Sequence, residues 1–309
     1  MDKKTKIYIA GHTGLLGAAI VRKLKLEGYN NLLLKTKQEL NLLDQESVNL
    51  FFEKEHPDIV ILCAAKVGGV AVNTTFPFDM LYDNIQIQNN VIGAANIYNV
   101  KKLLFVASST IYPSDCTQPI SESTLFQGPL DPIHESYGLA KICGIKLCEK
   151  LQKQSGKLFF TLVPTNIYGV GDHFEESRAH VIGALMTRFY KAKQEKLSEV
   201  VVWGSGNALR EFLYVDDVAN ACYFFITNSK HFSYVNIGTD HEISIRDLAF
   251  LIKKIVGYDG NIVFDTTKPE GRLRRKLDTS LACSLGWSAS ITLEEGLKKT
   301  YEYFLSIQN

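Results

Sequence analysis

The stretch KIYIAGHTGLLGAAIV (residues 6–21) sets an apolar run, a turn with three glycines and a second apolar run one after the other. The β-branched and aromatic residues of the first run predict a strand, and the spacing of the second run predicts a helix. Gly11, Gly14 and Gly17 stand between them in a G-x-x-G-x-x-G pattern. Glycine lets the backbone turn sharply and approach a pyrophosphate, while the following helix offers free N–H groups and a positive dipole to phosphates. The loop therefore predicts a dinucleotide site.

Strands and helices are expected to alternate from this loop up to residue 168. Short apolar runs rich in β-branched and aromatic residues separate segments with helical spacing, and Asp44 suits the N-cap of the second helix. Strict alternation is typical of an α/β fold with a doubly wound parallel sheet of the Rossmann type. The expected strands cover residues 6–11, 31–36, 58–65, 101–109 and 158–169, and the expected helices residues 15–29, 44–57, 80–100 and 136–156.

The alternation breaks in the second half of the chain, where strands and helices follow in mixed order. We expect residues 1–168 to form the dinucleotide-binding domain and residues 169–309 to form mainly a smaller, mixed substrate lobe. The sequence leaves open whether some segments of that lobe return to the first domain. The expected helices lie within residues 173–196, 214–227, 244–257 and 292–305, and the expected strands within residues 199–206, 233–238 and 261–265.

Composition excludes several classes of protein. The chain has 309 residues, of which 46% are hydrophobic, and a net charge of +1, so nothing indicates non-specific nucleic-acid binding. None of the six cysteines forms a C-x-x-C pair, and no Cys/His spacing indicates a metal site. The N-terminus has no apolar signal-peptide core, and no apolar run reaches the roughly 20 residues of a membrane helix. We expect a cytoplasmic protein without membrane contact.

The end of the second expected strand favours NADP(H) over NAD(H). A chain that binds NAD usually places an acidic residue here for the ribose 2′-hydroxyl. Lys35 and Lys37 stand there instead, and their positive charges suit a 2′-phosphate. The alternative is that both lysines are the solvated end of a strand.

A Y-x-x-x-K pattern lies on the fourth expected helix. Tyr137 and Lys141 are four residues apart, which puts both side chains on one helix face. A tyrosine has a pKa of about 10, and a nearby lysine cation would favour the phenolate and lower that pKa. The lysine could also hold the cofactor ribose. Two serines, Ser108 and Ser109, end the preceding strand.

Taken together, the glycine loop, the serines and the Y-x-x-x-K pattern resemble the extended short-chain dehydrogenase/reductase family. The resemblance carries the family's catalytic set onto Ser108, Tyr137 and Lys141. In such enzymes a hydride moves between the nicotinamide C4 and a carbonyl or alcohol carbon. The resemblance implies that Tyr137 donates a proton to the carbonyl oxygen and that Ser108 hydrogen-bonds that oxygen. The structural alternative is a tyrosine that only packs its helix.

Within this family the chain is similar to the GDP-L-fucose synthases over nearly its whole length. Those enzymes take a GDP-bound 4-keto-6-deoxy-mannose, epimerise its C3 and C5, and reduce the C4 ketone with NADPH. The motifs that carry the similarity include KVGG (66–69), SSTIYP (108–113), SYGLAKICGIKLCE (136–149), VPTNIYG (163–169) and VVVWGSGNALREFLYVDD (200–217).

The similarity also implies the residues that hold cofactor and substrate. Arg188 and Arg210 could neutralise a diphosphate, and Trp203 offers a flat apolar face to a base or sugar. Alternatively, Arg188 is a solvated helix residue and Trp203 a core residue. The implied NADP(H) contacts are Gly11, Thr13, Gly14, Leu15, Leu16, Gly17, Lys37, Asp44, Ala64, Ala65, Lys141, Pro164, Asn166, Ile167 and His180, and the implied contacts to a GDP-linked 4-keto sugar are Ser109, Thr110, Asn166, Arg188, Trp203, Arg210 and Glu270.

The sequence departs from that family at the cofactor loop and at the strand end. Thr13 and Lys37 stand where the family usually has arginines, although Lys37 keeps the positive charge. Thr110 stands where the family has a cysteine that works with a histidine in epimerisation, and His180 matches that histidine, although it could also be only a binding or packing residue. A threonine hydroxyl is far less acidic than a thiol, so it is a poor base for a carbon acid. Cys116, in the following loop, is an open substitute.

We therefore predict an NADPH-dependent C4 ketoreductase of a GDP-4-keto-6-deoxyhexose or GDP-4-keto-heptose, with Ser108, Tyr137, Lys141 and His180 as catalytic residues. The alternative within the family is a bifunctional GDP-L-fucose synthase. A nucleotide-sugar 4,6-dehydratase would carry Asp-Glu where Thr110 and Ile111 stand. A UDP-sugar 4-epimerase would carry tightly bound NAD, and a cofactor-sensing scaffold would not need an intact Ser/Tyr/Lys set. By resemblance we also expect a homodimer.

Overall fold

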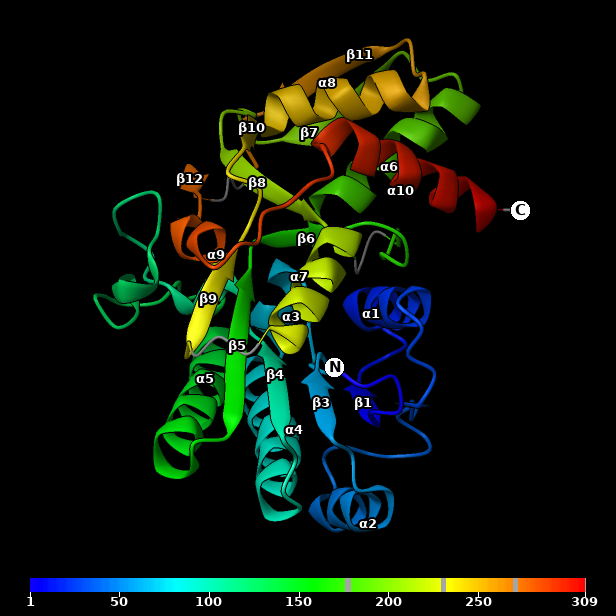
Figure 1. The fold of residues 1–309 in the computed structure, drawn as a ribbon. Coiled ribbons are helices and arrows are strands. Elements are labelled where there is room, and N and C mark those ends of the chain that lie inside the picture. The colour runs from blue at the N-terminus through cyan, green and yellow to red at the C-terminus, as the bar shows by residue number, and fades with distance from the viewer. Residues whose placement is uncertain (176–178, 229–231, 269–271, 309) are drawn as a thin grey trace.

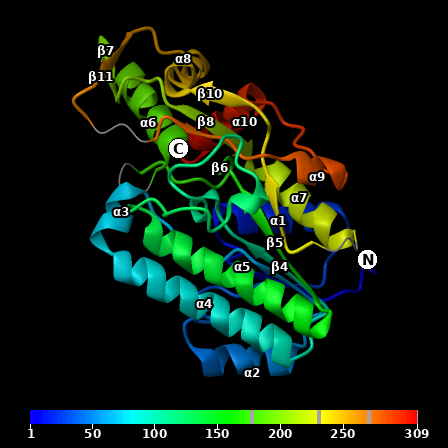
Figure 2. The same cartoon turned by 90° about the vertical axis from the view of Figure 1, so that its left-hand side faces the viewer.

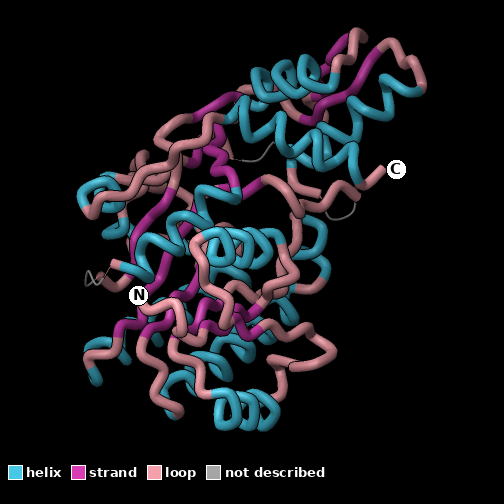
Figure 3. The backbone as a smooth tube through the Cα atoms, turned by 45° about the vertical axis from the view of Figure 1, so that its right-hand side comes forward, coloured by secondary structure: helices cyan, strands magenta, loops and turns pink. Residues whose placement is uncertain are grey.

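The computed structural model describes residues 1–175, 179–228, 232–268 and 272–308. The chain forms a larger lobe, at the bottom of Figure 1, and a smaller lobe at the top. Figure 3 shows that strands run through both lobes and that helices surround them. The candidate site residues come from both lobes.

A six-stranded parallel sheet forms the centre of the larger lobe, in the order β2–β1–β3–β4–β5–β9. Helices α2, α4 and α5 cover one face, and α1 and α7 pack on the other (Figure 2). Strands buried on both faces need the continuous apolar runs that the sequence supplies. The predicted doubly wound α/β fold is confirmed. The bounds are β1 Ile7–Ala10, β2 Leu32–Leu33, β3 Ile59–Leu62, β4 Lys102–Val106, β5 Leu158–Pro164, β9 Tyr234–Ile237, α1 Leu15–Leu26, α2 Gln45–Glu55, α3 Val70–Thr75, α4 Pro77–Ile97, α5 Glu135–Ser155 and α7 Val215–Thr227.

The second half of the chain contributes to this larger lobe. Strand β9 pairs in parallel with β5, with Val235 opposite Leu162, and α7 packs against α1. Residues after 168 therefore supply both the last strand of the sheet and part of its cover.

The smaller lobe is built around β8, which pairs antiparallel with β10 and parallel with β12 and β6. A separate parallel pair, β7 and β11, lies with helices α6, α8 and α10 over a third apolar core. The bounds are β6 Asn166–Tyr168, β7 Glu199–Trp203, β8 Leu209–Tyr214, β10 Glu242–Ser244, β11 Asn261–Asp265, β12 Arg274–Arg275, α6 Val181–Gln194, α8 Ile245–Val256 and α10 Leu293–Ser306. Two short 3-10 helices, η1 Ser109–Ile111 and η2 Glu122–Thr124, lie in the larger lobe, as does α9 Ser280–Ser284, which packs against β9.

Local expectations were met in part. Asp44 caps α2 by accepting hydrogen bonds from the N–H groups of Glu46 and Ser47. The strand expected over 158–169 is divided at Thr165, because β5 pairs within the large sheet and β6 pairs with β8. Strand β8 was missed, since Glu211 interrupts its apolar pattern. The structure buries that side chain fully and gives its carboxylate three backbone N–H donors, from Thr239, Asp240 and Leu277.

All six cysteines are free, and of these Cys148 and Cys222 are buried while Cys143 and Cys283 are exposed. Among the described residues, no helix has the length and apolar character to span a membrane. Over the same residues, no three His, Cys, Asp or Glu side chains are grouped so that they could hold a metal ion.

Candidate active site

The glycine loop between β1 and α1 leaves no room for side chains on its inner side. Gly11 has a φ of +88°, and a Cβ there would lie 2.7 Å from the Ala64 nitrogen. A Cβ on Gly17 would lie 2.1 Å from the Gly11 oxygen. At Gly14, the N-cap of α1, a Cβ would meet one atom at 3.5 Å, and no side chain caps the helix. A tight loop with an uncapped helix N-terminus fits a dinucleotide pyrophosphate.

The other predicted cofactor contacts come from several elements of the chain. Ala64 follows β3 and donates its N–H to the Ala10 oxygen at 2.9 Å. The turn after β6 comes close to α1, since a Cβ on Gly171 would lie 3.7 Å from the Leu15 Cα. Asn166 donates its side-chain amide to the Glu211 oxygen at 2.9 Å. Ala65 follows Ala64, Pro164 ends β5, Ile167 packs on the core beneath α1, Leu16 is buried, and Thr13 and Lys37 are exposed.

The Lys141 side chain is hydrogen-bonded to the end of β4. Its ammonium donates to the Val106 oxygen at 2.9 Å and lies 5.5 Å from the centre of the Tyr137 ring. The side chain is only 3% exposed, and burial lowers the pKa of Lys141 to about 8. The predicted pairing of Tyr137 with Lys141 on one face of a helix is therefore present.

Lys141 does not have the expected effect on the pKa of Tyr137. Burial raises the pKa of the Tyr137 hydroxyl well above its ordinary value. The prediction that the lysine cation lowers this pKa was wrong for the protein alone, because the shift is caused by desolvation of the half-buried phenol, which disfavours its charged form. Tyr137 is therefore protonated at neutral pH, which suits a proton donor.

Ser108 and Thr110 meet at the turn η1, which follows β4. The Ser108 Oγ accepts the Thr110 N–H at 3.3 Å and the Thr110 hydroxyl at 3.2 Å. The turn packs directly against α5, since a Cβ on Gly138 would lie 2.8 Å from the Thr110 carbonyl oxygen. Glycine next to Tyr137 thus brings the serine turn and the tyrosine helix together. Ser109, predicted to touch substrate, is 7% exposed.

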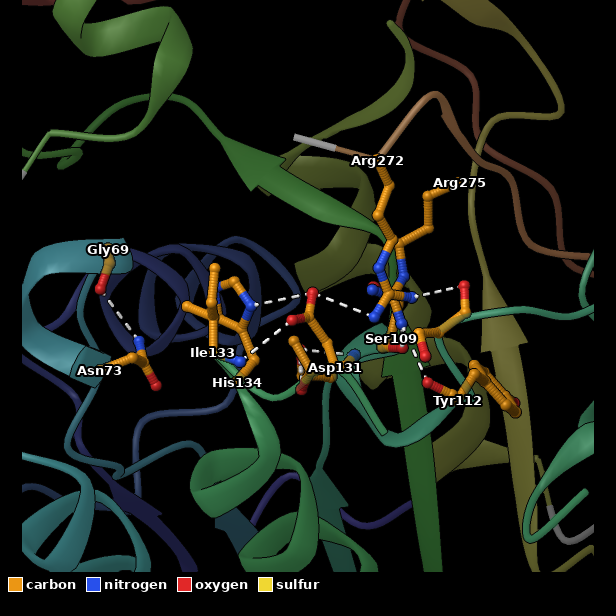
Figure 4. Close-up of polar contacts among 12 residues, drawn as sticks. Gly69, Asn73, Ser109, Tyr112, Asp131, Ile133, His134, Arg272 and Arg275 are labelled. Atoms are coloured by element: carbon orange, nitrogen blue, oxygen red, sulfur yellow. Dashed lines mark hydrogen bonds and ion pairs between the residues drawn. The ribbon is translucent and has the colours of Figure 1, made fainter. Parts of the chain in front are cut away.

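Two arginines that the sequence did not point out hold this turn and the loop after it (Figure 4). Arg275 donates to the Ser109 oxygen at 2.5 Å and to the Tyr112 oxygen at 3.4 Å. Arg272 donates to the Pro113 oxygen at 3.2 Å and forms an ion pair with Asp131 at 3.0 Å. The run RLRRK (272–276) was the available signal, but a basic run is more often a solvated segment.

Asp131 also faces His134, three residues before Tyr137. The Asp131 Oδ2 and His134 Nδ1 atoms are 3.5 Å apart. Burial is the main cause that lowers the pKa of His134, so its ring is neutral at pH 7. Figure 4 shows the chain of contacts from His134 through Asp131 to Arg272. The start of α5 is thereby tied to the segment that enters β12.

Cys116, the open substitute for the family's cysteine, carries a thiol whose ionisation is disfavoured. Its thiol donates to the Pro113 oxygen at 3.6 Å, and burial raises its pKa. A thiol with a raised pKa stays protonated and is a weak proton acceptor. His180, the predicted partner in epimerisation, is exposed at the N-cap of α6.

Three of the predicted sugar-nucleotide contacts, Arg188, Trp203 and Arg210, lie in the smaller lobe. The Arg188 guanidinium, from α6, lies 5.6 Å from the ring centre of Trp203, from β7, and Trp203 is 55% exposed. Trp203 is thus not a core residue. Arg210, on β8, donates to the Leu209 oxygen at 2.8 Å, and its charge, like that of Arg272, lowers the pKa of Arg275, although burial is the larger cause. Glu270 lies outside the described residues.

Comparison with known proteins places this site in a family. The model of the NAD dependent epimerase/dehydratase family matches residues 7–238. The chain belongs to this family. The predicted extended short-chain dehydrogenase/reductase relationship is therefore confirmed, as is the predicted oxidoreductase class.

GDP-sugar synthases and reductases are among the proteins that this chain is similar to. The chain is 49% identical to GDP-L-fucose synthase 1 of Arabidopsis thaliana over 304 residues, which cover 98% of this chain and 94% of that protein. It superposes on a GDP-6-OMe-4-keto-L-xylo-heptose reductase from C. jejuni with a TM-score of 0.93 and 37% identity, over 100% and 99% of the two chains. For a GDP-mannoheptose C4 reductase from Campylobacter jejuni, solved with NADP bound, the TM-score is 0.91 and the identity 38%, over 99% of each chain. The NADP in that neighbour agrees with the predicted cofactor.

Proposed function

We propose that this protein is an NADPH-dependent C4 ketoreductase of a GDP-4-keto sugar. The relatives named above all act on GDP-linked sugars, and the two solved neighbours are named as reductases. The substrate class is a GDP-4-keto-6-deoxyhexose or a GDP-4-keto-heptose. Both carry the same ketone and the same diphosphate.

The chain's own residues fit the cofactor. Gly11, Gly14 and Gly17 form the cradle at the start of α1, and a side chain on the inner glycines would fill it. Lys37 is exposed and suits the 2′-phosphate, and Lys141 suits the ribose. When bound, NADPH supplies the hydride that reduces the ketone.

Tyr137 supplies the proton in this proposal. Its hydroxyl is protonated at neutral pH, because burial raises its pKa, so it can donate to the ketone oxygen as that oxygen gains negative charge. Ser108 holds the same oxygen by a hydrogen bond. Lys141 is fixed to the Val106 oxygen and keeps a positive charge beside the tyrosine below pH 8.

The observation that carries the reductase assignment, without epimerisation, is Thr110. Its hydroxyl is hydrogen-bonded to Ser108 and has no accessible ionisation at neutral pH. Moving protons on and off C3 and C5 requires groups that ionise in that range. The substrate therefore keeps its configuration at C3 and C5, and a separate epimerase must act before this enzyme wherever the pathway inverts those carbons.

A substrate panel tests this function. Purified protein is mixed with NADPH and a set of GDP-4-keto sugars, both epimerised and not, and NADPH oxidation is followed by absorbance. NMR of the products gives the configuration at C3, C4 and C5. We expect NADPH oxidation and products changed only at C4. Absence of NADPH oxidation with every member of the panel would refute the proposal.

The second candidate is a bifunctional GDP-L-fucose synthase. It is favoured by the 49% identity to a protein of that name across 98% of this chain. It would require another residue to take the place of the cysteine, and Cys116 is held as a protonated thiol. A product inverted at C3 and C5 in the same panel would support this candidate.

We also propose that the protein is a cytoplasmic homodimer that pairs through α4 and α5. Phe78 and Tyr82 on α4 are 70% and 53% exposed, and their rings stack with centres 5.3 Å apart. Exposed aromatic pairs of this kind suit a subunit contact. Light scattering of the purified protein tests the dimer, and a Phe78→Asp variant should be monomeric. A monomeric wild type would exclude it.

A further inference from the structure

Thr110 faces Ser108 with two hydrogen-bond donors. Its N–H lies 3.3 Å from the Ser108 Oγ, and its hydroxyl lies 3.2 Å from the same atom. A serine hydroxyl has two lone pairs that accept hydrogen bonds and one proton that it donates. With both lone pairs turned toward Thr110, the Ser108 proton must point away from η1. A hydroxyl that accepts hydrogen bonds is also a stronger donor, because chained hydrogen bonds polarise one another.

The turn that carries this pair is fixed on both sides. Arg275 binds the Ser109 oxygen at 2.5 Å, and Ile111 is fully buried. On the other side, the Thr110 oxygen lies against α5 at Gly138, beside Tyr137. The orientation of the Ser108 hydroxyl is therefore set by the fold before a ligand binds.

We propose that Thr110 is a positioning residue for ketone reduction, which directs the Ser108 proton toward the substrate oxygen. This inference rests on the proposed function. In the reduction, hydride adds to C4 and the C=O π bond breaks, the Tyr137 proton passes to the oxygen, and NADPH is oxidised to NADP⁺. Ser108 stabilises the oxygen by its hydrogen bond and keeps its own proton. Thr110 thus takes part in the reductase reaction by orienting Ser108, in addition to replacing the cysteine that epimerisation would need.

Three variants separate this task from a structural one. Thr110→Val keeps the shape and removes the hydroxyl, and Thr110→Ser keeps the hydroxyl. Thr227→Val removes a hydroxyl that, among the described residues, bonds to carbonyls of its own helix, α7. We expect kcat to fall about tenfold in Thr110→Val, the size of one lost hydrogen bond. Thr110→Ser should regain at least a third of the wild-type kcat, and Thr227→Val should match the wild type.

A double-mutant cycle with Ser108→Ala shows whether Thr110 acts through Ser108. In the Ser108→Ala background, Thr110→Val should change kcat less than twofold. The KM for the keto sugar, the NADPH dissociation constant from fluorescence titration and the melting temperature should stay near those of the parent proteins. A Thr110→Val enzyme with wild-type kcat, or an equal loss in the Ser108→Ala background, would overturn the positioning role alone. A wild type that oxidises no NADPH would overturn the proposed function, and this inference with it.

Discussion

The candidate site has a fixed side, formed by Ser108, Tyr137 and Lys141, and an open side, formed by Arg188 and Trp203. The fold holds the fixed side more firmly than the open side. Lys141 is 3% exposed and bound to the end of β4, and the Ser108 turn is held between Gly138 and Arg275. On the other side, Trp203 is 55% exposed and stacks with Arg188. Groups that stabilise a transition state lower the activation barrier more when the fold fixes their positions before the substrate binds. An open aromatic face can accept related sugars, which suits a fold whose relatives act on different GDP-sugars.

The largest effect should come from the proton donor on the fixed side. Tyr137→Phe removes the hydroxyl and leaves the ring that packs near Lys141. We expect kcat to fall by about a thousandfold, because general acid catalysis contributes roughly 10²–10⁴. NADPH affinity and melting temperature should change little, which fluorescence titration and calorimetry measure. A variant with more than a tenth of the wild-type kcat would exclude Tyr137 as the donor.

The contact between η1 and α5 can be broken with one methyl group. A Cβ on Gly138 would lie 2.8 Å from the Thr110 oxygen, whereas a Cβ on Gly93, in α4, would have no neighbour within 4 Å. We expect Gly138→Ala to lower kcat more than tenfold and to lower the melting temperature. Gly93→Ala should leave kcat unchanged and stabilise its helix by up to about 1 kcal/mol. Equal behaviour of the two alanine variants would contradict a rigid turn.

The charge on Lys141 should limit activity at high pH. Burial lowers its pKa to about 8, so the cation is present below that pH and is lost as the pH rises through it. We expect kcat/KM to fall about tenfold between pH 8 and pH 9.5, since this ratio reports the ionisations of the free enzyme. The profile is measured from pH 6 to 10. A ratio that stays level up to pH 10 would show that the charge of Lys141 is not needed.

A substitution on the open side should give the smallest effect, and it should change KM rather than kcat. Trp203→Ala removes the aromatic face and leaves the fixed side untouched. We expect the KM for the keto sugar to rise about tenfold, as for one lost aromatic contact, with kcat within threefold of the wild type. Initial rates at varied sugar concentration separate the two constants. A lower kcat with an unchanged KM would place Trp203 with the reacting groups.

Much of the fixed side could be predicted because it is local in sequence. The glycine loop and the Tyr137–Lys141 pair follow from short spacings, and the Asp44 cap follows from its place before a helix. The contacts that hold the Ser108 turn could not be predicted. Arg275 and Ser109 are 166 residues apart, and no local pattern joins them.

The pKa of Tyr137 could not be predicted either, because it depends on burial that only the folded chain creates. The burial of Glu211 could not be predicted for the same reason. A charged side chain is typical of the surface, and only the folded chain brings three backbone N–H groups to this carboxylate. Long-range packing, rather than motif, decides these features.

We propose that the protein is a reductase without epimerase activity because Thr110 stands where the family has a cysteine. This proposal is tested most directly by incubating the protein with GDP-4-keto-6-deoxy-mannose in deuterated water, with no NADPH present, and following the C3 and C5 protons by NMR. A GDP-L-fucose synthase with the cysteine serves as the positive control. We expect deuterium to enter at C3 and C5 no faster than it does without enzyme. Rapid deuterium entry at either carbon would contradict it.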